Sequence, residues 1–354
     1  MQINADLKIT PVSPPQCVVE LPGSKPAPCT DSTSRHADEA RIELKLAHES
    51  IHQAWWTEGA YFPCLTGPSR DLSDGAAVYP ESFTAMVIAD LLMAQAEQAA
   101  VVENVMEMLE EEVTEDGLFH FFQEHDRLPA DADCTALGLS VLLLSGADVW
   151  QSAHLALDRI VTNVGELGVV ETYFGAAGRT GIIDPVVCAN VLVLAHLLGR
   201  EREVFSTYDY VCRVLTEGSF VAGTRYYHGP DTFLYFLGRL VHMFPATHGD
   251  LLEPLRAAIR DRHRATAHPI DVAQRLVVAR WVGLDDEAGS ERELLLALQR
   301  PDGTWPGDSL FRYGRRKIYF GSQALATAFA LGGLCPLAAV PVPEPKPRML
   351  PALF

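Results

Sequence analysis

Apolar residues recur at helical spacing along most of the chain, at positions i, i+3, i+4 and i+7. The segments with this spacing are of two kinds, which alternate along the sequence. The amphipathic, charged kind comprises residues 37–56, 99–114, 150–164, 200–216, 250–264 and 286–300. The kind that is apolar almost all round comprises residues 80–97, 132–145, 184–199, 230–244, 268–283 and 320–334. Because an apolar helix must be buried and an amphipathic helix can cover it, the alternation predicts an inner ring wrapped by an outer ring.

This arrangement is an all-α fold, an (α/α)6 barrel of about twelve helices. The inner helices begin roughly every 40 to 50 residues, which is the spacing of a supersecondary repeat. Residues 1–35 are rich in proline and have no helical period, so we predict an extended N-terminal arm. The barrel is expected over residues 36–338, followed by a proline-rich C-terminal tail over residues 339–354. No strand pair is expected in the body of the chain.

The composition excludes several functional classes. With 354 residues and 48% hydrophobic content the chain can bury a large core, and its net charge of −18 argues against a nucleic-acid partner. No apolar stretch is long enough for a transmembrane helix, and no secretion signal is visible, so a cytoplasmic protein is expected. Peripheral membrane contact and oligomerisation stay open. Seven cysteines without a CxxC pair and twelve histidines without an HExxH motif indicate reduced thiols and no metal site.

The starts of the inner helices carry most of the candidate chemistry. Four of them have an aspartate in the first turn, namely Asp133, Asp184, Asp231 and Asp271. Helix capping and the helix dipole are sufficient reasons for such aspartates. The loops that lead into these helices are long and rich in aromatic residues, as in "DGLFHFF" and "TRYYHGP". In a barrel of this kind these loops lie at one end, so acids and aromatic rings are expected together there, either as a site or as a plug of the barrel mouth.

One of these helix starts resembles a known motif. The segment Asp131-Ala132-Asp133-Cys134-Thr135-Ala136 is similar to the acid motif of class II terpene cyclases. It fits the Asp-x-Asp-Asp-Thr-Ala pattern of squalene–hopene and diterpene cyclases except at Cys134, and it contains the Asp-Cys-Thr-Ala of oxidosqualene cyclases. The repeat signature of that superfamily, Gln followed by Gly-x-Trp, is visible at Gln299, Gly303 and Trp305. The family has (α/α)6 catalytic domains, but its typical members are about twice as long.

The resemblance implies a cyclisation that begins when an acid protonates an alkene or an epoxide of a hydrophobic isoprenoid. Asp133 is then the proton donor, Asp131 supports it, and Cys134 stands where the family has a second aspartate and donates a weak S–H bond to the acid. Such an acid has to stay protonated near neutral pH, and burial next to a like charge raises a carboxyl pKa. No cofactor is expected.

Carbocations are stabilised by aromatic faces without reacting with them. The residues predicted to face the substrate or its cations are Trp56, Phe122, Tyr173, Tyr227, Tyr313, Cys188 and Asp231. One basic run stands out in this acidic protein, namely Arg312, Arg315, Arg316 and Lys317. It is either a solvated loop or a site for the diphosphate of a linear prenyl substrate, and Mg²⁺ is expected only in the second case.

Three other functions stay open. A zinc-dependent prenyltransferase could use Asp131, Asp133, Cys134 and His228, although the usual Asp-x-Cys spacing is missing. A glycan-active barrel could pair Asp133 with Asp231 or Asp271. Finally, the missing second aspartate of the acid motif is compatible with a barrel that binds a hydrophobic ligand or a protein without catalysis.

Overall fold

The structure is a computed structural model, and it describes residues 32–348 except 58, 60, 79, 126, 176–178 and 336–339, with side chains from residue 44 onward. By its contacts the chain divides into a unit of residues 1–40 and a unit of residues 41–354, and the barrel lies in the second unit. Of the predicted arm, residues 1–35, only residues 32–35 lie within the described part of the chain. The boundaries proposed for arm, barrel and tail therefore stay predictions.

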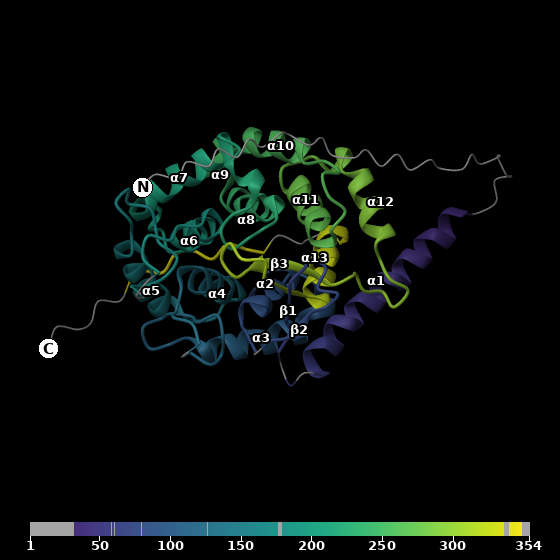
Figure 1. The fold of residues 1–354 in the computed structure, drawn as a ribbon, viewed down its shortest axis with the longest axis horizontal. Coiled ribbons are helices and arrows are strands. Elements are labelled where there is room, and N and C mark those ends of the chain that lie inside the picture. Colours follow the sequence, from purple (N-terminus) through teal and green to yellow (C-terminus); the bar gives the residue numbers. More distant parts are fainter. Residues whose placement is uncertain are drawn as a thin grey trace, which may run out of the picture. The chain divides into compact units, whose positions relative to one another are not determined.

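The predicted alternation of inner and outer helices is confirmed. The inner helices are α2 (Phe83–Leu92), α4 (Ala132–Ser145), α6 (Pro185–Leu197), α8 (Pro230–Met243), α11 (Pro269–Trp281) and α13 (Gln323–Leu334). Each of them contacts the next, and α13 contacts α2, which closes the ring. The outer helices are α1 (Ser32–Thr57), α3 (Ala99–Glu112), α5 (Trp150–Thr162), α7 (Phe205–Thr216), α10 (Leu252–Asp261) and α12 (Gly289–Ala297). Figure 1 shows α3, α5, α7, α10 and α12 around the inner helices.

The two kinds of helix differ in burial as their sequences indicate. All residues of α4 from Ala132 to Leu143 are buried, because almost none of them carries a charge that needs water. In α3 the buried side chains are those of Val101, Val105, Met106 and Leu109, which follow one face at helical spacing. Short segments complete the connections: α9 (Pro245–His248) and the 3₁₀ turns η1 (Ala96–Gln98), η2 (Glu201–Val204), η3 (Ser219–Ala222), η4 (Gly249–Leu251) and η5 (Asp285–Glu287).

A small sheet corrects the expectation that the body holds no strand pair. Its four antiparallel strands lie in the order β2 (Ala76–Ala77), β1 (Leu65–Gly67), β4 (Tyr319–Ser322) and β3 (Asp308–Arg312). The hairpin β3–β4 pairs Arg312 with Tyr319, and it delays the last inner helix, which begins at Gln323 rather than at 320. A Cβ at Gly321 would lie 2.2 Å from the carbonyl oxygen of Asp308, so the close pairing of β3 and β4 requires a glycine there.

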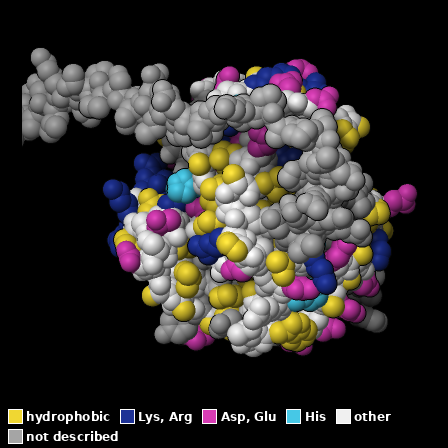
Figure 2. All heavy atoms as spheres, turned by 90° about the vertical axis from the view of Figure 1, so that its right-hand side faces the viewer, with side chains coloured by type: hydrophobic (Ala, Val, Ile, Leu, Met, Phe, Trp, Pro, Cys, Tyr) yellow, Lys and Arg dark blue, Asp and Glu magenta, His cyan; other side chains and the backbone are white. Residues whose placement is uncertain are grey.

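Among the coloured residues of the face drawn in Figure 2, acidic and basic side chains are interspersed. Residues 340–348 have no regular secondary structure, and the backbone oxygen of Lys346 lies 2.9 Å from Nε2 of His154 on α5. Among the described residues no helix is both long and apolar enough to cross a membrane.

Candidate active site

The acid motif lies at the start of the buried inner helix α4. Asp131 is the N-cap, and its Oδ1 accepts the backbone N–H groups of Asp133 at 2.9 Å and of Cys134 at 2.8 Å. The side chain of Asp131 is therefore turned toward the helix end, as capping requires. Asp133 follows in the first turn. Both carboxyl groups are buried, with 6% of Asp131 and 8% of Asp133 exposed to solvent.

The partners of Asp133 are neutral. Asn190 on α6 donates from Nδ2 to Oδ1 of Asp133 at 2.8 Å. The hydroxyl of Tyr227, from the loop before α8, donates to Oδ2. Within the described part of the chain, neither Asp131 nor Asp133 forms an ion pair with a lysine, arginine or histidine. Residues from α4, from α6 and from the loop before α8 thus meet at the Asp133 carboxyl group, and the hydrogen-bond donors among them are uncharged.

Burial decides the ionisation of both acids. Burial, together with the negative charge of Asp131, raises the pKa of Asp133 to about 8, although the hydrogen bonds from Tyr227 and Asn190 act in the opposite direction. Burial also raises the pKa of Asp131 to about 6, against the hydrogen bonds that it accepts from Cys134 and Asp133. Asp133 is consequently the group that holds its proton at neutral pH.

Asp133 lines a cavity of about 320 Å³, which is near the lower end of the roughly 300–1,000 Å³ typical of small-molecule sites. Nine of its sixteen lining residues are aromatic, namely Phe83, Phe121, Phe122, Tyr173, Tyr226, Tyr227, Phe311, Tyr313 and Phe320. The others are Arg127, Leu128, Asp131, Asp133, Cys134, Thr172 and Arg312. The rings pack on one another: Phe311 lies 5.6 Å from Phe320 and 5.7 Å from Phe83 between ring centroids. The polar acids and the aromatic rings therefore share one chamber.

Several predicted site residues line this cavity, and others do not. Phe122, Tyr173, Tyr227 and Tyr313 join the acid motif there. Trp56 does not: it is 55% exposed on α1, because the neighbouring Trp55 takes the buried face of that helix.

Cys188 and Asp231 also lie elsewhere. The Cys188 side chain is buried inside α6 and is absent from the cavity lining. Asp231 is held by Arg262 at 2.8 Å and by Arg275 at 2.8 Å, so its negative charge is already neutralised. Neither residue lines the cavity that holds Asp133.

The role expected of Cys134 needs a correction as well. Among the described residues the Cys134 thiol forms no hydrogen bond with Asp133, whereas the backbone N–H of Cys134 donates to Oδ1 of Asp131 at 2.8 Å because Asp131 caps the helix. Burial raises the pKa of this thiol well above its ordinary value, so it stays neutral.

The basic run does not converge on a single point. Arg312 lines the cavity, but its guanidinium donates to the backbone oxygens of Thr224 at 2.6 Å and Arg225 at 3.3 Å. Arg315 lines a neighbouring polar cavity, and Arg316 lies over the ring of Tyr313 at 5.8 Å. Arg315, Arg316 and Lys317 are exposed in the turn between β3 and β4. Of the four cations, Arg312 alone lines the chamber that holds Asp133.

Sequence reasoning missed several members of the site. Asn190 carried a usable signal, since a lone amide in an otherwise apolar helix has to find a partner when it is buried. Phe121, Tyr226 and Phe311 lie in ring-rich segments, and Phe83 begins helix α2, but nothing in the sequence distinguishes them from rings such as Phe119, which is buried away from the cavity. Arg127 belongs to the same lining.

The geometry also bears on the other enzyme classes. The residues considered for zinc do not converge, because Nε2 of His228 lies 2.9 Å from the backbone oxygen of Ser309. Among the described residues no group of three His, Cys, Asp or Glu side chains is arranged to hold a metal ion. Asp231 and Asp271 are each bound to an arginine, so neither faces Asp133 as a second catalytic carboxylate.

Comparison with known proteins finds relatives among the terpene cyclases. Residues 120–197, which include the acid motif and Asn190, match the model of the sesquiterpene cyclase astC-like C-terminal domain. Drimenol cyclase drtB of Aspergillus calidoustus is 32% identical over 208 residues, which are 58% of this chain and 38% of that protein. The chain thus spans about two fifths of the length of this curated relative.

Solved structures show the same fold at low sequence identity. Type II terpene cyclase MstE from Scytonema is 16% identical with a TM-score of 0.61, over 84% of this chain and 98% of that one. A protein from Actinoplanes is 18% identical with a TM-score of 0.61, over 83% and 98%. The ent-copalyl diphosphate synthase of Streptomyces platensis is 16% identical with a TM-score of 0.51, over 72% of this chain and 50% of that one. In sequence around Asp133 and in fold over most of its length, this chain resembles the class II terpene cyclases, as its acid motif indicated.

Proposed function

We propose that this protein is a class II-type terpene or meroterpenoid cyclase and that Asp133 is the acid that starts the reaction. One observation carries the proposal: a carboxyl group that keeps its proton near neutral pH lies in the wall of a chamber lined mainly by aromatic rings. Similarity to a drimenol cyclase and to type II terpene cyclase folds supports it.

In the first step the O–H bond of Asp133 breaks and its proton goes to an alkene carbon or an epoxide oxygen of the substrate. With an alkene, the π electrons form the new C–H bond and leave a tertiary carbocation, which further double bonds attack in turn. Loss of a proton or addition of water then ends the sequence. The carboxylate left on Asp133 is stabilised by the donors that already face it, the Tyr227 hydroxyl and the Asn190 amide.

The chamber suits the cations that follow. Ring faces attract a carbocation through their quadrupole and do not trap it as a lone pair would. A lining dominated by rings also limits water, which would quench the cation before ring closure. The lining has few lone-pair donors, mainly the tyrosine hydroxyls, Thr172 and the acid motif itself.

The cations beside the chamber favour a substrate with an anionic head. Arg127 and Arg312 line the cavity, and the guanidinium of Arg179 lies 4.7 Å from the Tyr173 ring centroid. The guanidinium of Arg312 has further N–H groups besides those that bind Thr224 and Arg225. A linear prenyl diphosphate fits this arrangement, and Mg²⁺ would then accompany the substrate as a counter-ion.

The test is direct incubation of the purified protein with geranyl, farnesyl and geranylgeranyl diphosphates, squalene and epoxidised polyprenyls, followed by mass-spectrometric product analysis. We expect cyclic products from at least one substrate with wild-type protein. They should be absent with Asp133→Asn and unchanged with Asp209→Asn, which removes an exposed carboxylate on α7. Turnover that survives in Asp133→Asn would exclude this acid, and tight ligand binding without turnover would favour a binding protein.

A further inference from the structure

One wall of the acid chamber comes from the small sheet that the sequence did not predict. Phe311 and Arg312 on β3, Tyr313 in the turn, and Phe320 on β4 all line the cavity. Phe311 also stacks on Phe320 and meets Phe121 edge-on at 5.4 Å between centroids. The shape of the chamber therefore depends on where this hairpin lies relative to the inner helices.

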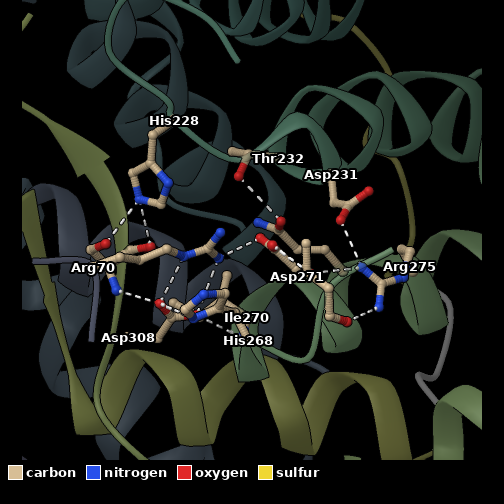
Figure 3. A network of polar contacts seen from close by, with 12 residues as sticks. Arg70, His228, Asp231, Thr232, His268, Ile270, Asp271, Arg275 and Asp308 are labelled. Carbon is tan, nitrogen blue, oxygen red and sulfur yellow. Dashed lines mark hydrogen bonds and ion pairs between the residues drawn. The ribbon is translucent and has the colours of Figure 1, made fainter. Parts of the chain in front are cut away.

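A buried ion-pair cluster fixes the start of that hairpin. The guanidinium of Arg70, from the loop after β1, lies 2.5 Å from Oδ1 of Asp271 on α11 and 3.1 Å from Oδ1 of Asp308 on β3 (Figure 3). The backbone oxygen of Arg70 accepts the N–H of Ser309 at 3.0 Å, and Asp308 accepts the N–H of Ile270 at 3.2 Å. The Arg70 side chain thus joins the loop after β1 to strand β3 and to the inner helix α11.

The same strand holds the loop that carries Tyr227. The N–H of Arg312 donates to the backbone oxygen of Tyr226 at 2.7 Å, and the Arg312 side chain donates to Thr224. Nε2 of His228 lies 2.9 Å from the Ser309 oxygen (Figure 3). Burial and the nearby charge of Arg70 lower the pKa of His228 to about 3, so the ring is neutral at neutral pH and donates this bond. The hydrogen-bonded chain from Arg70 therefore ends one residue from the partner of Asp133.

We propose that Arg70 is a positioning residue of the acid chamber. By bridging Asp271 and Asp308 it holds the β3–β4 hairpin and the Tyr227 loop in the positions that give the chamber its shape, and so determine how the substrate folds inside it. The assignment rests on the proposed cyclase function. It concerns how the substrate chain is folded over the acid, and so which products form, and not the proton transfer itself.

The chemistry of the cluster explains why this position needs an arginine. Asp271 and Asp308 are both buried, so without a cation between them their charges would repel each other or one would have to be neutralised. A planar guanidinium can bind two carboxylates through separate N–H groups, whereas the ammonium of lysine is a single point of charge. Arg70→Lys should therefore keep part of the bridge between Asp271 and Asp308, and Arg70→Met should keep none of it.

The first readout needs no substrate. Hydrogen–deuterium exchange of Arg70→Met is expected to rise by about tenfold or more in residues 308–312 and 224–228, while α4 keeps its protection. Arg239→Met is the matched control, because Arg239 forms a buried 2.6 Å ion pair with Asp90 at the other ends of α8 and α2. Its loss should destabilise the barrel without changing exchange in these two segments.

The second readout uses a substrate that the wild type cyclises. In Arg70→Met we expect kcat/KM to fall by about ten- to a hundredfold and incompletely cyclised products to accumulate, with the high-pH limb of the profile unmoved. Arg70→Lys should lie between the two. Unchanged exchange in both segments, or an Arg239→Met variant with the same altered exchange and products, would overturn the assignment. If the wild type cyclises none of the substrates, the proposed function fails, and the exchange measurement still decides whether Arg70 holds the wall.

Discussion

The inner-helix starts at Asp133, Asp231 and Asp271 look alike in the sequence, but the partners of the three aspartates in the structure differ in charge. All three aspartates lie in the first turn of an inner helix, and all are buried. Asp231 is paired with Arg262 and Arg275, and Asp271 with Arg70. Asp133 has only neutral donors.

The electrostatic consequence follows from the partners. Burial opposes the charged form of Asp271, yet the adjacent Arg70 holds the pKa of that carboxyl below its ordinary value. Burial without a cation raises the pKa of Asp133 to about 8. Position at a helix start therefore does not by itself fix the pKa of an aspartate: the pKa of Asp271, beside Arg70, is lowered, whereas that of Asp133, beside neutral donors, is raised.

The largest effect is expected from removing the acid itself. Asp133→Asn keeps the size of the side chain but cannot supply a proton, so kcat should fall by about 10³-fold or more, within the range of general acid catalysis. Circular dichroism should show an unchanged fold. Residual activity within a factor of ten of wild type would place the proton donor elsewhere.

The same substitution at the arginine-paired Asp231 should affect stability instead of catalysis. Asp231→Asn leaves Arg262 and Arg275 without this buried counter-charge, and removing one partner of a buried pair costs about 3–5 kcal/mol. Urea denaturation measures the loss. The protein that stays folded should retain the wild-type pH profile, and a loss below about 1 kcal/mol would mean that the cluster is not important for stability.

A smaller effect is expected at the neutral partner of the acid. The hydrogen bond from Tyr227 lowers the pKa of Asp133 against the effect of burial, so Tyr227→Phe should raise that pKa further. The acid becomes weaker and its conjugate base less stabilised, and kcat should fall by about tenfold while the high-pH limb moves upward. A limb that moves downward would contradict this assignment of the hydrogen bond.

The smallest effect is expected at Trp56, an aromatic residue that belongs to none of the compared helix starts. Its exposed ring lies outside the chamber lining, so Trp56→Ala should leave kcat and product composition within about twofold of wild type and change stability by less than about 0.5 kcal/mol. Product analysis and thermal unfolding test both statements. A changed product pattern would show that α1 reaches the substrate.

The parts of this molecule that could be predicted from sequence are those set by local periodicity. The alternation of apolar and amphipathic segments predicted the two rings of helices. A helix buried on one face has apolar residues at helical spacing, whereas a helix buried on all faces is apolar throughout. The motif around Asp133 likewise stands in six consecutive residues.

What could not be predicted depends on distant contacts. Arg70 and Asp271 are 201 positions apart, and Asp133 meets Asn190 and Tyr227 across 57 and 94 positions. The hairpin β3–β4 is short, and its aromatic residues could equally belong to a loop. That the segment forms strands depends on the pairing of β4 with the distant strand β1. The sequence therefore indicates the candidate acid and some of the rings around it, such as Tyr227, but not the long-range contacts that hold them in place.

The central claim, that Asp133 keeps its proton in the folded protein, is tested most directly by the pH dependence of stability. Because its pKa is raised above the ordinary 3.8, the folded state holds a proton that the unfolded state has lost, and this contribution to stability disappears as pH rises. Urea denaturation of wild type and Asp133→Asn from pH 5 to pH 9 isolates it. We expect the stability of the variant to rise relative to wild type by about 1.4 kcal/mol per pH unit until the pH reaches the pKa of about 8, and not to rise further beyond that pH. A difference that is constant from pH 5 upward would mean that Asp133 is ionised in the folded protein, and it would contradict the account.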